Sequence, residues 1–112
     1  MTVLDAGDFK LRQGVLELIA GIALNAVGGA SGVAVRPDHP EERRKRKHLV
    51  KGIRAEVEGG TVSIDLEAHM EYGKDFRAVA EEVQREVARA VAQMTGWEVK
   101  EVNVTVVGVN AL

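Results

Sequence analysis

Four side chains that could carry out chemistry recur at every second position of one predicted strand, namely Asp65, Glu67, His69 and Glu71. Alternate residues of a strand point to the same face, about 7 Å apart, so the four share one face. Carboxylates beside a histidine could bind a metal ion or transfer protons. The alternative, which we favour, is that they form the solvent-exposed face of an amphipathic strand.

The rest of the sequence offers no catalytic machinery. The chain has no cysteine, which excludes disulfides, thiol nucleophiles and Cys-ligated metals. The three histidines are scattered outside any HExxH motif, and Thr61 and Ser63 lack an identifiable neighbouring base. The glycines match neither the GxGxxG nor the P-loop pattern. We therefore expect no catalytic residue, no metal and no cofactor.

The charges are distributed unevenly. Residues 36–54 contain eight Lys or Arg and three acids, whereas the other residues contain seven bases and fourteen acids. The candidate residues for binding an anion or a partner are Arg43, Arg44, Lys45, Arg46, Lys47 and Lys51. They could bind nucleic acid by counterion release, although no aromatic lies among them to stack a base. They could instead bind anionic lipid, or simply form a solvated loop or pair with the acidic face of a neighbouring subunit.

Residues 14–27 predict a helix that is apolar nearly all round, with Val15, Leu18, Ile19, Ile22 and Ala26 at helical spacing. Such a helix is buried on more than one side or offers an apolar face to a partner. Val15, Leu18 and Ile22 are candidate self-association residues, and we expect a homo-oligomer. Gly21 predicts a close backbone approach, since glycine within a helix costs about 1 kcal/mol relative to alanine. Gly28-Gly29 predicts a left-handed end to the helix.

The region that follows predicts a loop and then a β-hairpin. Residues 36–48 are expected to form a basic, proline-flanked loop, in which residues 41–48 could include a frayed helical turn. Gly59-Gly60 suits a two-residue turn between alternating strands. The predicted pairs are Val57 with Val62, Ala55 with Ile64, Ile53 with Leu66, and Arg54 with Asp65. Short extended segments are also predicted at residues 9–12 and 31–35.

The C-terminal half predicts a second helix and a final strand. Asp75 is a suitable N-cap and Gly96 a stop for a helix whose buried stripe is Phe76, Val79, Ala80, Val83, Val87, Ala90, Val91 and Met94. A strand over residues 98–109 should turn Val102, Val104 and Val106 inward. The predicted fold class is α+β: one domain over residues 1–112, a two-layer sandwich. In it, a small mixed β-sheet of the hairpin and the C-terminal strand is covered by two helices.

Membrane and export signals are absent from the sequence. No apolar run reaches the roughly 18 residues of a membrane span. The first eight residues include Asp5 and Asp8 and do not resemble a signal peptide. We therefore expect a cytoplasmic protein without a transmembrane segment of its own.

Several short motifs follow one another in the second half: Lys51-Gly52-Ile53-Arg54, Ile64-Asp65-Leu66, Glu71-Tyr72-Gly73, Val79-Ala80-Glu81-Glu82-Val83-Gln84, Met94-Thr95-Gly96 and Glu101-Val102-Asn103-Val104. In order and spacing the chain resembles the alkaline shock protein family of Gram-positive bacteria, also called the envelope stress response family. Residues 15–23 and Gly32-Val33 fit more loosely. The segment 41–48 departs from the family in being longer and more basic.

The resemblance implies a non-enzymatic structural or interaction protein of cell-envelope homeostasis and of the alkaline or general stress response. It implies a cytoplasmic protein, peripheral at the inner face of the membrane, where a membrane-anchored partner protein holds it and where it can self-associate. The family defines no catalytic residues. The alternative function is that of a regulator that binds nucleic acid through residues 43–54.

Overall fold

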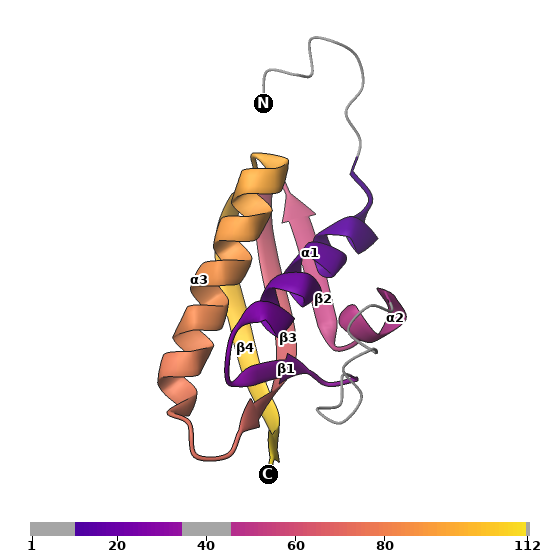
Figure 1. Cartoon of the computed structure of the whole chain (residues 1–112). Coiled ribbons are helices and arrows are strands. Elements are labelled where there is room, and N and C mark those ends of the chain that lie inside the picture. The colour runs from indigo at the N-terminus through magenta and orange to yellow at the C-terminus, as the bar shows by residue number, and fades with distance from the viewer. Residues whose placement is uncertain (1–10, 35–45, 112) are drawn as a thin grey trace.

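The computed structural model describes residues 11–34 and 46–111 and consists of one sheet with helices on one of its faces (Figure 1). Along the chain the elements are α1 (Gln13–Ala26), β1 (Ala30–Gly32), α2 (Arg46–Leu49), β2 (Ile53–Glu58), β3 (Thr61–Glu71), α3 (Phe76–Thr95) and β4 (Glu98–Asn110). Helices α1 and α3 lie side by side over the sheet. The predicted α+β class is confirmed.

Strand β3 is the centre of the sheet. Strand β4 runs parallel to it from the pair Thr61–Glu98 to the pair Glu71–Asn110. Strand β2 pairs antiparallel with the first half of β3, and β1 pairs antiparallel with residues 68–70. Because β4 occupies one edge of β3 throughout, β2 and β1 lie end to end along the other edge. The sheet is mixed, as predicted.

The hairpin of β2 and β3 has the predicted register. Its pairs include Val57–Val62, Ala55–Ile64, Ile53–Leu66 and Arg54–Asp65. Gly59 and Gly60 form the turn with φ of 59° and 82°, a region that L side chains rarely adopt. The apolar residues of this hairpin face the helices and form the centre of the core.

Helix α3 begins and ends where the sequence predicts. The Asp75 carboxylate accepts a hydrogen bond from the Ala78 N–H at 3.1 Å, and Gly96 ends the helix with φ of 77°. The buried stripe is Val79, Val83, Val87, Val91 and Thr95. The prediction was wrong for Phe76 and Met94, which are 37% and 67% exposed. The stripe advances in steps of four residues, so Thr95 takes the last buried place and Met94 falls about 100° away from it.

Of the apolar residues at helical spacing, α1 buries only Ile19. Its buried apolar residues are Leu16, Ile19, Ala20, Ala23 and Leu24, whereas Ile22 is 54% exposed. Both sides are apolar, so spacing alone could not choose between them. The predicted left-handed cap was also wrong: the helix ends at Val27 in extended backbone. Because β1 starts at Ala30, the chain must turn at once into the sheet, and Gly29 makes that turn with φ of 94°.

The ends of the sheet account for the remaining differences. Val102 is buried and Val104 half-buried, but Val106 is 38% exposed because α3 starts at Phe76 and covers little beyond it. The extended segment predicted at 31–35 is the shorter β1. Of the strand predicted at 9–12, residues 9 and 10 lie outside the described residues, and Arg12 is the N-cap of α1.

Candidate functional site

The candidate site is the surface made by the outer side of α1 and by the short helix α2 beside it, which we call the α1–α2 surface. The two helices touch at Gly21. A Cβ added there would collide with the carbonyl oxygen of Leu49 and lie 2.8 Å from its carbonyl carbon. Leu49 itself is buried. The close approach predicted from Gly21 is therefore confirmed, and its partner is the backbone of α2.

The basic candidates are only partly described. Arg43, Arg44 and Lys45 lie outside the described residues, as do positions 36–42 of the predicted loop. Arg46 and Lys47 are exposed on α2 and Lys51 in the turn after it. Residues 46–49 are helical, so the described part of the predicted loop is a helical turn, the alternative offered for residues 41–48. This helical turn places Leu49 against α1 while its charged residues stay in solvent.

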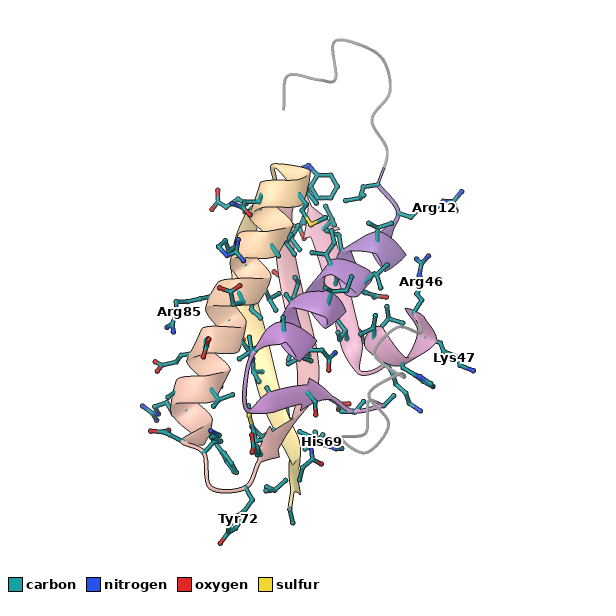
Figure 2. All side chains as sticks on the ribbon, viewed as in Figure 1. Arg12, Arg46, Lys47, His69, Tyr72 and Arg85 are labelled. Atoms are coloured by element: carbon teal, nitrogen blue, oxygen red, sulfur yellow. The ribbon has the colours of Figure 1, made fainter. Side chains whose placement is uncertain are left out.

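Helix α2 places its first arginine beside the start of α1. The Arg46 Nη2 lies 3.2 Å from the position that a Cβ of Gly14 would occupy. Arg12, the N-cap residue of α1, extends into solvent on the same side of the molecule (Figure 2). His48 is half-buried, and its Nδ1 atom is buried without a hydrogen-bond partner in the part of the chain that the structure describes.

Of the three self-association candidates, Leu18 and Ile22 lie on the outer side of α1, whereas Val15 packs against the hydrophobic core. At about 100° per residue, Leu18 and Ile22 fall opposite the buried stripe. Val15 and Leu18 are half-buried, and Ile22 is the exposed member of the three. The structure thus brings an apolar helix face next to the cations of α2, although these residues are distant in sequence.

The two polar residues inside α1 bind the backbone of the sheet, a role that the sequence analysis missed. The Asn25 amide donates to the Gly21 carbonyl at 2.8 Å and accepts from the Gly32 N–H at 3.0 Å. The Glu17 carboxylate accepts from the Ala55 N–H at 3.4 Å. The sequence signal for this role was that both are isolated polar residues in an otherwise apolar helix. These bonds fix the rotation of α1 and hence the side that it presents to solvent.

The carboxylate and histidine face of β3 lies on the side of the sheet away from the helices. Asp65 and Glu67 are exposed, and the Asn103 amide donates to Asp65 Oδ1 at 2.8 Å. The His69 ring lies over Gly108, with Cδ2 2.9 Å from the position of an added Cβ. Within residues 11–34 and 46–111, no three such side chains gather to hold a metal ion. The geometry matches a solvated strand face with local hydrogen bonds.

Neither α3, with 20 residues, nor any shorter helix of the described chain combines the length and apolar character that a bilayer crossing needs.

Comparison with known proteins gives one family. A model of the alkaline shock protein 23 family, described as having a cell envelope-related function, matches residues 2–111. The chain is 27% identical over 111 residues to the "Uncharacterized protein YqhY" of Bacillus subtilis (strain 168), covering 92% of this chain and 77% of that protein. It is 29% identical over 112 residues to the "Uncharacterized protein Spy1535" of Streptococcus pyogenes serotype M6, covering 99% and 85%.

A third relative is longer. The "Stress response regulator gls24 homolog" of Streptococcus pyogenes serotype M3 is 31% identical over 105 residues, which cover 92% of this chain and 59% of that protein. The chain thus spans under two thirds of this relative. No solved structure matches the chain.

Proposed function

The chain belongs to the alkaline shock protein 23 family, whose function is related to the cell envelope, and from this we propose that it is a non-enzymatic interaction protein of cell-envelope homeostasis and of the alkaline or general stress response. It acts through protein–protein contacts at the inner face of the membrane. A partner protein with its own membrane span holds it there.

The observation that carries this proposal is the composition of the α1–α2 surface. Ile22 is 54% exposed on a helix whose other large apolar side chains are buried or half-buried, and the exposed cations of Arg46 and Lys47 lie on the neighbouring helix. An apolar side chain beside cations suits a partner segment with an apolar anchor and flanking acids. The acidic remainder of the chain would not attract such a segment.

Fractionation of cells tests the proposal. With chromosomal replacement in the source organism, the wild-type chain should sediment with membranes, and Ile22→Asp should shift it to the soluble fraction. Met94→Asp is the matched control, because Met94 is 67% exposed on the other large helix. The proposal is contradicted if both variants fractionate like the wild type.

A charge-reversal pair tests the cations of the same surface. Arg46→Glu with Lys47→Glu should release the chain from membranes, whereas Lys74→Glu with Arg77→Glu, an equal charge change at exposed positions near the start of α3, should not. Purified chain mixed with vesicles of anionic lipid separates a protein partner from lipid. Binding to protein-free vesicles as strong as to native membranes would argue against a protein partner.

The second candidate is a regulator that binds nucleic acid. The exposed Arg46, Lys47 and Lys51 support it, and one relative is named a stress response regulator. Labelled DNA and RNA titrated at two salt concentrations decide between the two. Tight binding with a steep salt slope, lost in the Arg46→Glu/Lys47→Glu chain, would favour this regulator over the envelope role.

A further inference from the structure

The outer edge of β4 carries backbone groups that no strand of the described chain pairs with, and their direction follows from the rest of the sheet. The Glu67 N–H bonds the Gly52 carbonyl at 3.0 Å and the Glu71 N–H bonds the Gly29 carbonyl at 2.9 Å. Odd-numbered residues of β3 thus direct their backbone groups toward the β1 and β2 edge. Successive residues alternate in direction, so the even-numbered residues direct theirs toward β4.

In the parallel ladder, Ile64 pairs with Val102 and Leu66 with Val104. The backbone N–H and C=O groups of Ile64 and Leu66 point toward β4 and bond the residues before and after their partners. The backbone groups of the partners themselves, Val102 and Val104, therefore point away from β3. The N–H and C=O groups of Val102, Val104 and Val106 therefore point away from the sheet. The Gln84 side chain agrees with this, since its Nε2 donates to the Val102 carbonyl from outside the ladder at 3.1 Å.

An uncharged row of α3 lies above this edge. Since Gln84 reaches Val102, the row in steps of four residues that contains Gln84 follows the outer side of β4: Phe76, Ala80, Gln84 and Ala88. Phe76 is 37% exposed. We call this row, with the outward edge of Val102, Val104 and Val106, the β4 edge surface. The opposite edge of the sheet differs, because Glu17 of α1 bonds the Ala55 N–H of β2.

We propose that the β4 edge surface binds a second copy of this chain, with the two β4 strands antiparallel about a two-fold axis at Val104. In this register Val104 lies opposite Val104 of the partner subunit, and Val102 lies opposite Val106 of the partner subunit. The outward groups of these three valines then form hydrogen-bonded pairs, and one sheet continues through both copies. A carbonyl oxygen has two acceptor positions, so Gln84 can keep its bond.

The occupant is a second copy because the strand is complementary to itself. Glu98, Lys100 and Glu101 lie opposite Asn110, Gly108 and Val107 of the partner subunit, so no like charges meet. From residue 102 to residue 110 the strand has neither charge nor proline. A long, uncharged edge of this kind is a template for pairing with another strand.

The helices are also compatible with this two-fold axis. Val104 is about 7 Å along the strand from Val102, a distance that four or five helical residues span. Counting from Gln84 toward the start of α3, this places the small residue Ala80 at the axis. Arg85 then lies level with Asp75 of the partner subunit. Figure 2 shows Arg85 pointing away from α1, the direction from which the second copy would approach.

Sedimentation of the purified chain gives the first test. The wild type should show a concentration-dependent monomer–dimer equilibrium. Ala80→Glu places two carboxylates at the axis and should raise the dimer dissociation constant about tenfold or more. Ala78→Glu, at an exposed position of the same helical turn, should leave it unchanged. An equimolar mixture of Ala80→Glu and Ala80→Lys should dimerise again, which a folding defect could not produce.

Cross-linking tests the register, and the absence of native cysteines makes it clean. Asn103 lies opposite Thr105 of the partner subunit in a pair without mutual hydrogen bonds, with Cα atoms about 4.5 Å apart, close enough for a disulfide. A mixture of Asn103→Cys and Thr105→Cys chains should form a cross-linked dimer on oxidation. Each variant alone should cross-link far less, since equivalent cysteines lie two residues out of register.

Three results would overturn the proposal: a wild type that stays monomeric at every concentration, a dimer that Ala80→Glu leaves intact, or a dimer lost through Ile22→Asp instead. The last would assign self-association to α1. A monomeric chain that binds an added extended peptide along β4 would also count against it. All measurements use purified chain without membranes, so their failure leaves the envelope proposal to its own test.

Discussion

Helices α1 and α3 cover the same face of one sheet but are held there differently. Helix α3 has a single buried stripe, a charged outer side and capping groups at both ends. Helix α1 is apolar nearly all round and contacts the sheet, α3 and α2 on three sides. Its polar residues Asn25 and Glu17 accept hydrogen bonds from the sheet backbone. An apolar helix can therefore be a sign of many neighbours within one chain, and its one exposed large apolar side chain, Ile22, becomes the informative residue.

The largest expected loss of stability comes from truncating a fully buried side chain of α1 or α3. Leu24 and Val87 are both fully buried. Leu24→Ala should lower the free energy of unfolding by about 3 kcal/mol and Val87→Ala by about 2 kcal/mol, because the leucine loses more apolar volume. Urea denaturation followed by circular dichroism measures both. A smaller loss for Leu24→Ala than for Val87→Ala would mean that α1 packs on the core less tightly than α3.

The next effect isolates the contact between α1 and α2. Gly21→Ala should destabilise the chain by about 2 kcal/mol, because the new methyl group meets the Leu49 backbone. This loss should appear although alanine favours a helix over glycine by about 1 kcal/mol. Gly28→Ala is the matched control, since its Cβ meets no atom within 4 Å. A stabilised Gly21→Ala chain would show that α2 does not pack on α1 in solution.

A smaller effect compares the two helix starts. Asp75→Ala removes the side-chain cap of α3 and should cost about 1 kcal/mol in thermal or urea unfolding. Arg12→Ala should change stability by less than about 0.5 kcal/mol, because Arg12 makes no side-chain cap bond in α1. If both substitutions lowered the free energy of unfolding equally, the side-chain cap of α3 would not distinguish its start from that of α1.

The smallest effect concerns the outer side of α3. Arg89 donates to Glu86 at 2.7 Å, and this hydrogen bond holds the pKa of Glu86 below its ordinary value of 4.5. A lowered pKa in the folded state stabilises the fold above that ordinary value, and the contribution is lost as the pH falls through the folded pKa. Because solvent reaches both side chains and weakens their attraction, Glu86→Gln should match the wild type in unfolding at neutral pH and in acid. A clear difference at neutral pH that vanishes in acid would contradict this.

The accuracy of the sequence predictions differs between these regions for physical reasons. The hairpin was predictable in register, because alternation and the Gly59-Gly60 turn are independent local signals that agree. The orientation of α1 was not, since Leu16 and Ile22 are both apolar and the neighbours that distinguish them are remote in sequence. Strand β1 has only three residues, too few to show a period.

The candidate surfaces also combine features that the local sequence reveals with features that it does not. Gly21 predicted a close contact but could not name Leu49 as its partner. Arg46 and Lys47 were recognisable by charge, whereas the direction of the Val102, Val104 and Val106 backbone groups depends on the register with β3. A property that arises from pairing between distant segments has no local pattern to reveal it.

The end-to-end arrangement of β1 and β2 on one edge of β3 has a consequence for how this fold can diversify. The chain leaves that edge after Gly32 and returns to it at Ile53, and each strand has its own register with β3. Residues inserted between Ala34 and Arg46 change neither register and leave the contact of Leu49 with α1 in place. The family can therefore vary the length and charge of this connection at little cost to the core, and the same site would accept an engineered insertion such as an epitope tag.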